Sequence, residues 1–447
     1  MNRTNILILK FLVCLSILLI AGPGWGRCTR TGASQTEDNR TALIPFGKIN
    51  LTDAYFTPPG SLLTSVVVPP TNYTYGGATG STVLWECDEA DLPGIYFLVA
   101  TNGDDRVGGF YDIGNNDGLT DVYATWFAYV GLRQNMAGVT VTRYWQKVPV
   151  TSYATTSARK IQIRLQDIPP LQAELYRIST LPGTSARTAW CGNNNNDGSG
   201  VGYASPSGRS YTCVQPNSYI QLSGDDTVSF AFAHDAPGQD SATNYNFWGA
   251  DNGFGYGMRT ANSLYNNPTC VARSADPVVT FPAISATELE AGMTGNASFT
   301  VRVECSDSAQ SGIADTQTAM GIQVSEGAYR AAQSLGLVNP SGGVSALVSD
   351  NYSDTGMAKG VGITLAHSDT PANTLTFVGQ PGLATLTPGG NSAGWYPVMS
   401  GATSAGSVNN GYTYYTYSFI ATLKKINNMT VTPGRVHATA YVLVKMQ

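Results

Sequence analysis

The sequence predicts an all-β protein made of two domains, and three observations support this class. Several stretches alternate apolar and polar side chains with a period of two, the pattern of half-buried strands. Charged residues make up only 12% of the 447-residue chain, which also contains 49 Gly and 24 Tyr, and this composition favours strands and turns. No stretch keeps a helical period, and residues 286–291 suit one short helical turn at most. We expect β-sandwiches.

The first 26 residues have the features of a secretory signal. Arg3 and Lys10 supply positive charge, an apolar run follows, and Gly24 and Gly26 provide the small residues that cleavage requires. The apolar run is shorter than the roughly 20 residues of a membrane span. We therefore expect residues 1–26 to be removed and the mature chain to be exported.

The charge balance argues against nucleic acid as a partner. The chain has 25 basic and 30 acidic side chains, and removal of Arg3 and Lys10 leaves 23 against 30, a net charge of −7. No run of Lys and Arg occurs, whereas phosphate backbones attract clustered cations.

Seven cysteines are present, and Cys14 lies in the predicted signal. The other six are Cys28, Cys87, Cys191, Cys213, Cys270 and Cys305. An even count in an exported chain indicates disulfides, although six cysteines allow 15 connectivities. Sequential pairing (28–87, 191–213, 270–305) is the simplest hypothesis. Zinc is disfavoured because no Cys-x-x-Cys occurs and the three His residues are scattered. We expect no metal and no cofactor.

Alternation marks predicted strands along the whole chain. The stretches concerned are 161–165, 227–233, 299–305, 361–365, 415–421 and 436–446. Asn266-Asn267-Pro268 is a turn or linker signal. We therefore divide the mature chain into an N-terminal domain, 27–266, and a C-terminal domain, 267–447.

The last 14 residues show the clearest pattern. Their apolar face consists of Val436, Ala438, Ala440, Val442, Val444 and Met446. Arg435, His437, Thr439, Tyr441 and Lys445 lie mostly on the other face. A long strand with one apolar face usually needs a partner on its edge, although an ordinary last strand of a sandwich would look similar.

Residues 268–447 resemble the pilin domain of chaperone–usher fimbriae. In that family a Gly stands fourteenth from the C-terminus before an alternating strand, and Gly434 holds that place. The next-to-last residue is usually aromatic, so Met446 departs from the pattern. The family's disulfide joins an early strand to a later one, which suits Cys270 and Cys305. Segments 278–281, 299–303, 335–340 and 360–365 also resemble pilin strands and mid-domain segments.

The resemblance implies an incomplete immunoglobulin-like sandwich that lacks its final strand. A periplasmic chaperone first lends a strand, and the N-terminal extension of the adjacent pilin then replaces it at the outer-membrane usher. The apolar face of residues 434–447 would border the groove that receives these strands, because β-strand addition uses main-chain bonds and alternating side-chain pockets.

The layout resembles two-domain tip adhesins such as those of type 1 and type 3 fimbriae. The chain begins with a large cysteine-bearing domain instead of a short donor extension, so we expect it to end a fibre. By this resemblance the N-terminal domain is a lectin-like β-sandwich that binds a host glycan or a matrix protein. The expected location is the fimbrial tip at the surface of a Gram-negative bacterium, reached through the periplasm.

Candidate ligand residues in the N-terminal domain combine carboxylates and amides with aromatic rings, as sugar sites do. They are Asp112, Asn115, Asn116, Asp117, Trp190, Asn195, Asp197 and Tyr203. Residues 251–256 form a weaker candidate. The alternative is that Asn, Asp and Gly here simply make turns. Residues 193–198 match half of a calcium loop, but Ala204 stands where Glu is required. Trp85, Trp126, Trp145 and Trp248 are expected in the core.

The sequence leaves two alternatives to adhesion as the function. A hydrolase is suggested by Gly390-Asn-Ser392-Ala-Gly394, but no Asp or Glu follows Ser392, so the triad order fails. His234 and Asp235 are adjacent, and adjacent strand residues point to opposite faces. A glycan-active carboxylate pair is not visible in a sequence. We expect no enzyme activity. A structural minor pilin, whose extra domain only caps the fibre, is the second alternative.

Overall fold

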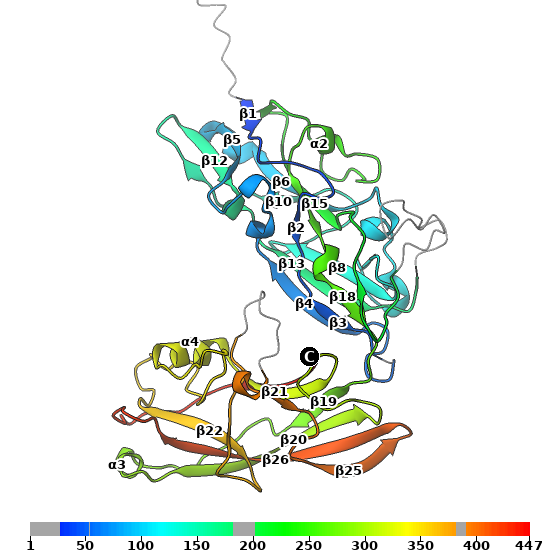
Figure 1. Ribbon diagram of the computed structural model, residues 1–447. Coiled ribbons are helices and arrows are strands. Elements are labelled where there is room, and N and C mark those ends of the chain that lie inside the picture. Colours follow the sequence, from blue (N-terminus) through cyan, green and yellow to red (C-terminus); the bar gives the residue numbers. More distant parts are fainter. Residues whose placement is uncertain (1–26, 53, 182–201, 381–389) are drawn as a thin grey trace, which may run out of the picture. The chain divides into compact units, whose positions relative to one another are not determined.

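The computed structural model describes residues 27–52, 54–181, 202–380 and 390–447 (Figure 1). The chain divides into two compact units. Unit 1 comprises Met1–Ile49, Pro59–Tyr203 and Arg209–Leu264, and unit 2 comprises Asn50–Pro58, Ala204–Gly208 and Tyr265–Gln447. No sequence pattern predicts that the short segments 50–58 and 204–208 belong with the C-terminal unit. The predicted signal, residues 1–26, lies outside the described residues.

Unit 1 contains three five-stranded sheets in its described part. The first has the order β11 (Ala154–Thr155), β12 (Lys160–Arg164), β5 (Val83–Asp88), β1 (Arg27–Arg30) and β16 (Ser229–Phe230). The second has the order β10 (Gln146–Pro149), β6 (Ile95–Thr101), β15 (Ser218–Gly224), β17 (Phe254–Gly257) and β2 (Thr41–Leu43). The third joins β4 (Leu62–Val68), β13 (Leu171–Arg177), β8 (Val130–Met136) and β7 (Tyr123–Ala124), with β9 (Val139–Thr140) paired to β8.

Small elements complete unit 1. A short sheet joins β14 (Arg209–Ser210), β18 (Ser263–Tyr265) and β3 (Lys48–Asn50), and α2 spans Asn246–Gly249. Helical turns occur at Pro70–Asn72, Tyr75–Gly77, Glu89–Gly94, Arg106–Phe110, Gly114–Asp117, Leu165–Asp167 and Arg259–Ala261. The alternation predicted for 161–165 is present, because Ile161 and Ile163 are fully buried in β12. Leu165 is also buried, but it begins a helical turn.

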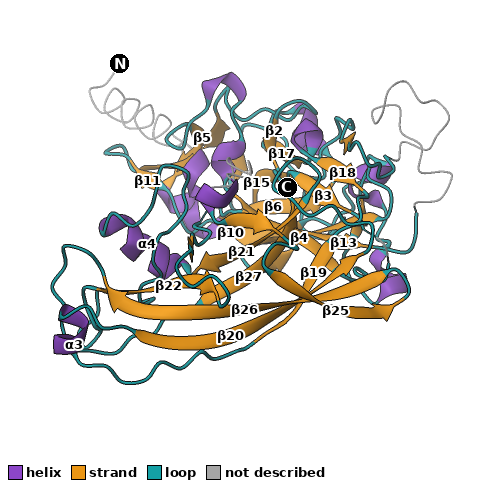
Figure 2. Cartoon of the chain, turned by 60° about the horizontal axis from the view of Figure 1, so that its bottom comes forward, coloured by secondary structure: helices purple, strands orange, loops and turns teal. Residues whose placement is uncertain are grey.

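Unit 2 contains one large and one small sheet in its described part. The large sheet has the order β19 (Cys270–Ala275), β20 (Gly295–Ser306), β26 (Tyr412–Lys425), β22 (Val361–His367) and β23 (Thr374–Leu375), with β25 (Ala402–Asn409) also paired to β26. The small sheet has the order β24 (Trp395–Pro397), β21 (Thr318–Val324) and β27 (Ala440–Met446). Two helices, α3 (Ala286–Glu290) and α4 (Glu326–Ser334), and a turn at Gly390–Ala393 complete it. Figure 2 shows the long β20–β26 pair with α3 at one end.

Side-chain burial explains most strands of unit 2 and corrects one expectation. Val301, Val303 and Cys305 of β20 are fully buried, as their alternation predicts. Glu304 belongs to the opposite face, which the pattern assigns to solvent, yet it is also fully buried. Its carboxylate accepts hydrogen bonds from Arg273 Nε at 2.6 Å and from the Tyr55 hydroxyl at 2.8 Å. Segment 50–58 therefore covers a charged side chain that would otherwise face water.

The helix α4 contradicts the expectation that no sustained helix occurs. It begins at a Ser325 cap, whose hydroxyl accepts from Ala328 N at 3.1 Å. Only Ala328 and Ala332 are buried, and they are one turn apart on the same face. The side chains that this face buries are small, so the sequence of the helix shows no row of large apolar residues.

Candidate functional sites

An apolar groove of about 450 Å³ lies in unit 2. One wall comes from residues 279–284 and the other from residues 431–434 and Val436. Leu289, Ala358, Val361 and Leu423 also line it. Every lining side chain is uncharged, since the set consists of Val, Thr, Phe, Pro, Ala, Ile, Leu and Gly. The groove therefore suits an apolar occupant.

The first wall exists because the chain leaves the sheet after β19. Beyond Ala275 the backbone makes one further hydrogen bond to the neighbouring strand, from Asp276 N to Thr300 O at 3.1 Å. No strand follows between β19 and α3. Val278 is 77% exposed, whereas Val279, Phe281 and Ile284 are half-buried against the core of unit 2. A segment with apolar side chains and few backbone partners can accept an added strand.

The second wall is fixed by a close approach of two backbones. A Cβ at Gly434 would lie 2.4 Å from Ala358 N and 2.7 Å from Gly356 O. Real Cβ atoms do not come so close to other atoms, so only Gly fits this position. Arg435 N then donates to Gly356 O, and Ala358 N to Arg435 O, both at 2.9 Å. These contacts give Gly434 a physical role beside the groove.

The predicted C-terminal strand is shorter than expected. It begins at Ala440 instead of Val436, because Asp350 holds the preceding residues outside the ladder. The Asp350 carboxylate accepts from Thr439 N at 3.0 Å and from the Thr439 hydroxyl at 2.6 Å, and its backbone N donates to His437 O at 3.0 Å. Ser325, the α4 cap, also donates to this carboxylate at 2.5 Å.

β27 pairs antiparallel with β21 over its whole length, from Ala440 opposite Val324 to Met446 opposite Thr318. It is an edge strand of the small sheet as described. Four of the predicted apolar positions, Val436, Ala438, Val442 and Val444, pack on the core of unit 2, and Met446 is buried, but Ala440 is exposed. Their role in pairing with a chaperone or pilin remains a proposal.

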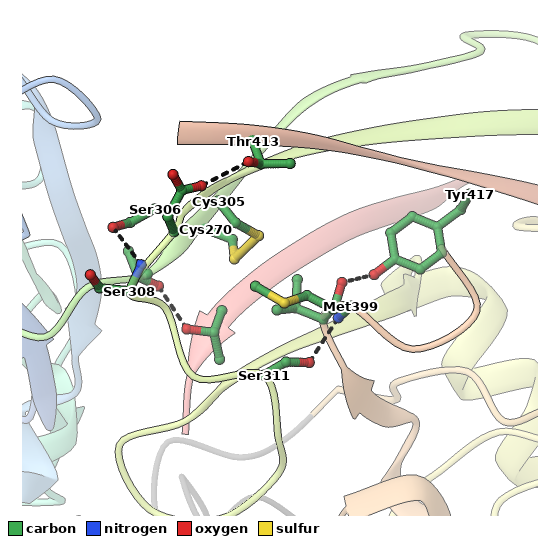
Figure 3. The surroundings of a disulfide bond; sticks show 12 residues. Cys270, Cys305, Ser306, Ser308, Ser311, Met399, Thr413 and Tyr417 are labelled. Carbon is green, nitrogen blue, oxygen red and sulfur yellow. Dashed lines mark hydrogen bonds between the residues drawn. A yellow bond between two sulfur atoms is a disulfide. The ribbon is translucent and has the colours of Figure 1, made fainter. Parts of the chain in front are cut away.

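A disulfide anchors the start of this unit. Cys270 and Cys305 lie directly opposite each other on β19 and β20 and are bonded. Figure 3 shows their surroundings, in which Thr413 Oγ1 donates to Asp307 at 2.7 Å and Met399 N donates to Ser311 Oγ at 2.8 Å. The bridge therefore fixes the strand that leads into the first wall of the groove.

The other cysteines lie in unit 1. Cys28 and Cys87 are bonded and join β1 to β5. Cys213 is disulfide-bonded, and its predicted partner, Cys191, lies outside the described residues.

Three of the four predicted ligand residues in loop 112–117 make contacts within the protein. Asp117 Oδ2 accepts from Ser179 N at 2.8 Å, and Asn116 Nδ2 donates to Thr180 Oγ1 at 2.9 Å, so both side chains tie the loop to residues 179–180. The Asp112 carboxyl bonds to backbone groups of residues 114, 121 and 122, and burial raises its pKa. Asn115 is exposed.

The second predicted loop is not described. Trp190, Asn195, Asp197 and the half-matched calcium loop, 193–198, lie outside the described residues. Tyr203 is 49% exposed, and its ring lies 6.4 Å from that of Tyr129. No cluster of three or more potential metal ligands occurs in the described part of the chain.

In the weaker candidate, residues 251–256, three side chains belong to the core of unit 1. Asn252 is fully buried; its Oδ1 accepts from Trp85 Nε1 at 2.9 Å and its Nδ2 donates to Leu222 O at 2.9 Å. Phe254 and Tyr256 are buried in β17. Asp251 is half-buried and lies 3.9 Å from Arg30.

A cavity of about 330 Å³ in unit 1 brings together residues that sequence reasoning did not select. Its polar lining is Asp38, Asn102, Asp104, Gln215 and Ser241, and its aromatic lining is Tyr219, Tyr245, Phe247 and Trp248. We call this set the acidic-aromatic pocket. Trp85, Trp126 and Trp145 are buried as expected, whereas Trp248 is half-buried and lines this pocket.

The polar floor of the pocket is a connected network. Gln215 Nε2 donates to Asp38 Oδ2 at 2.6 Å, and Asn102 Nδ2 donates to Pro216 O at 2.9 Å. Asn102 Oδ1 accepts from Asp104 N at 3.0 Å, which orients the loop after β6. Buried amides with all partners fixed hold the surrounding loops rigidly.

Electrostatics distinguish Asp38 from the other pocket residues. Burial raises the pKa of Asp38, the Gln215 hydrogen bond opposes that rise, and the charges of Asp105 and Asp104 add to it. Arg259 is the cation that acts in the opposite direction. Burial raises the pKa of Tyr219 well above its usual value, and the charges of Asp38, Asp104 and Asp105 add to that rise. Excess negative charge therefore collects around this cavity.

Asp235 supports the aromatic wall instead of serving a catalytic His. Its carboxylate, 2% exposed, accepts from Asn246 N at 3.0 Å, Asn246 Nδ2 at 2.8 Å and Gln221 Nε2 at 3.0 Å. These bonds fix the start of α2, which carries Phe247 and Trp248. His234 Nδ1 lies 2.9 Å from Ser223 Oγ, so the two adjacent side chains engage different partners.

Ser392 of the Gly-x-Ser-x-Gly match lies in the turn Gly390–Ala393, and β24 follows that turn. Its hydroxyl donates to Ser341 Oγ at 3.2 Å. A nucleophile elbow leads from a strand into a helix, so this geometry differs from it. No helix in the described ranges combines the length and apolarity that a membrane crossing requires.

A family of known proteins and several solved structures are similar to this chain. Residues 259–447 match the family of fimbrial proteins. Similar solved structures include the P pilus rod subunit PapA, which is 16% identical with a TM-score of 0.21, over 40% of this chain and 92% of that chain. The CupB6 tip adhesin from Pseudomonas aeruginosa is 12% identical with a TM-score of 0.25, over 83% and 89%.

A third structure, the CsuC–CsuE chaperone–tip adhesion subunit complex of Acinetobacter baumannii, is 10% identical with a TM-score of 0.19, over 89% of this chain and 96% of that chain. A search of the curated proteins found no match. The match to the fimbrial family thus covers the C-terminal part of the chain, residues 259–447, which is less than half of its length.

Proposed function

We propose that this protein is a chaperone–usher fimbrial tip adhesin, anchored to the fibre through unit 2 and attached to a surface ligand through unit 1. The observation that carries the proposal is the apolar groove of unit 2. Its walls are the half-paired segment 279–284, residues 431–434 and Val436, which lie in the segment matched to the fimbrial family.

The groove supports assembly by strand addition. Half-buried Phe281 and Val436 contact the core from opposite walls and leave part of their surface to an occupant. A strand laid between the walls would bury this apolar surface and pair with free backbone groups. We infer that a periplasmic chaperone supplies the first strand. An adjacent pilin replaces it at the outer-membrane usher, which places the protein on the cell surface.

Unit 1 supplies the attachment function in this proposal. It carries a cavity of its own with polar and aromatic lining, a combination typical of sites for small polar ligands. Binding is non-covalent and requires no catalysis, and the ligand is a glycan of a host or surface. The alternatives to this proposal are that unit 1 binds a matrix protein and that it only caps the fibre.

The test of anchoring compares two charged substitutions on adjacent residues. Val436→Asp would place a carboxylate in the groove, whereas Arg435→Asp alters an exposed neighbour that is not part of its lining. We expect Val436→Asp to lose copurification with the chaperone and incorporation into fibres, and Arg435→Asp to keep both. Equal behaviour of the two variants would refute anchoring through the groove.

The test of attachment uses bacteria whose fibres contain or lack this subunit. We expect adherence to host cells to require the subunit. If bacteria that lack it still make fibres and adhere equally well, the chain is a structural cap and the adhesin proposal is wrong.

A further inference from the structure

We propose that the acidic-aromatic pocket of unit 1 is the ligand site and that it takes a neutral saccharide. This inference rests on the proposed attachment role and names its site and ligand class. Neither the predicted loop at 112–117 nor Tyr203 contributes to the pocket. The cavity volume of about 330 Å³ lies at the small end of the range for ligand pockets, which suits a sugar ring better than a folded protein segment.

The pocket offers hydrogen-bond acceptors that have no protein donor. Asp104 is exposed, and its carboxylate makes no hydrogen bond or ion pair with the residues that the structure describes. Asp38 uses Oδ2 for Gln215, and Oδ1 has no hydrogen-bond partner in the described part of the chain. Ionised carboxylates accept hydrogen bonds but donate none. A ligand must therefore present donors to this side of the pocket.

The pocket also offers donors without acceptors. The Tyr219 side chain is 7% exposed, yet within the described residues its hydroxyl has no hydrogen-bond partner. Tyr245, 52% exposed, likewise has a free hydroxyl in the described part of the chain. An acceptor on a ligand could pair with either hydroxyl.

The combination selects a hydroxyl-bearing ligand. A hydroxyl group both donates and accepts, so vicinal hydroxyls can satisfy Asp104 and Asp38 as well as Tyr219. A cation would donate to the carboxylates but would leave the phenol unsatisfied. An acidic sugar would be repelled by the negative charges of Asp38, Asp104 and Asp105, which the positive charge of Arg259 opposes.

The aromatic wall provides the apolar contact that the carbon face of a sugar requires. Trp248 and Phe247 lie edge-on to the Tyr219 ring, with centroids at 5.8 Å and 5.1 Å. Trp145 Nε1 donates to Asn244 O at 3.0 Å and holds the loop that precedes α2. Because protein contacts already fix these rings, little conformational entropy would be lost on binding.

The experiment screens the full chain, purified from the periplasm, on an array of neutral, sialylated, sulfated and amine-bearing glycans. We expect binding to a neutral saccharide. Asp104→Asn and Tyr245→Ala should each weaken that binding at least tenfold. Asp226→Asn and Tyr153→Ala, which alter an exposed Asp and an exposed Tyr that do not line the pocket, should leave it unchanged.

Three results would overturn the inference: no glycan bound, binding only of charged probes, or neutral binding that Asp104→Asn and Tyr245→Ala leave intact. Far-ultraviolet circular dichroism and thermal melting establish that each variant is folded. Adherence of fimbriated bacteria separates the two proposals. Adherence that needs the subunit but survives both pocket variants refutes the pocket alone, whereas adherence that never needed the subunit refutes the adhesin.

Discussion

Truncating one groove residue should weaken donor-strand binding by a predictable amount. Phe281 is half-buried in the free chain. Replacing a fully buried Phe with Ala costs about 3–5 kcal/mol, so a half-buried ring should contribute about half of that before a strand binds. An inserted strand covers the remaining surface and restores the full contribution. Phe281→Ala should therefore lose about 2 kcal/mol of complementation energy, which is about 30-fold in affinity.

Phe299 provides a matched control in the same unit. It is also half-buried against the unit 2 core, and its ring lies 5.3 Å from Phe419, but it is not part of the groove. Phe299→Ala should lower the stability of free and complemented protein equally. We expect its effect on donor affinity to be less than about twofold, because residues without shared partners contribute independently.

The assay titrates the full chain with a synthetic peptide of the adjacent pilin's N-terminal extension. Calorimetry measures the affinity, and the rise in melting temperature on saturation checks it independently. If Phe281→Ala and Phe299→Ala weaken the peptide equally, the groove is not where the strand binds. If neither variant weakens it, the apolar side chains do not supply the binding energy.

Three further predictions concern assembly, stability and pH. Val444→Asp places a charge on the packed face of β27 and should abolish chaperone capture, measured as loss of the subunit from the periplasm. Arg273→Ala leaves the buried carboxylate of Glu304 without its cation and should cost about 3–5 kcal/mol of unfolding free energy in urea. Glycan affinity should fall as the pH drops through the raised pKa of Asp38, because a protonated carboxyl loses an acceptor; titration calorimetry across pH measures this.

Each of these predictions has a control. Tyr441→Asp alters a β27 side chain that is 52% exposed and should keep normal periplasmic levels. Arg302→Ala removes an exposed cation from the same sheet and should change stability by less than about 0.5 kcal/mol. Asp38→Asn should remove the part of the pH dependence that follows the raised pKa of Asp38; an unchanged pH dependence in this variant would assign it to another group.

The fold of unit 2 was largely predictable because period-two alternation is a local signal. The pattern over 299–305 and 361–365 corresponds to β20 and β22. β20 buries Val301, Val303 and Cys305, whereas all residues of β22 from Val361 to Ala366 are buried. Two details depended on distant residues. Asp350 delays the start of β27 until Ala440, and Tyr55 and Arg273 make burial of Glu304 tolerable. No local pattern carries either contact.

The pocket of unit 1 was invisible to sequence reasoning for a related reason. Its lining comes from four separate parts of the chain, represented by Asp38, Asn102, Gln215 and Trp248. One of these parts, residues 240–252, is itself rich in Asn, Asp and aromatic residues, but the sequence does not show that it meets the other three parts. Loop 112–117 also has such a composition, and Asn116 and Asp117 bond to residues 179–180. Composition marks single segments, whereas the proposed pocket depends on how the sheets bring distant loops together.

The two cavities differ in chemistry in a way that separates the two proposed tasks. The groove has only uncharged lining, which suits an apolar strand better than a charged ligand. The pocket presents Asp38 and Asp104, and burying an apolar strand against them would leave both carboxylates unsolvated and without partners. Groove variants should therefore change assembly without changing glycan affinity, and pocket variants should do the reverse. A substitution in either cavity that altered both properties would show that the units do not act independently.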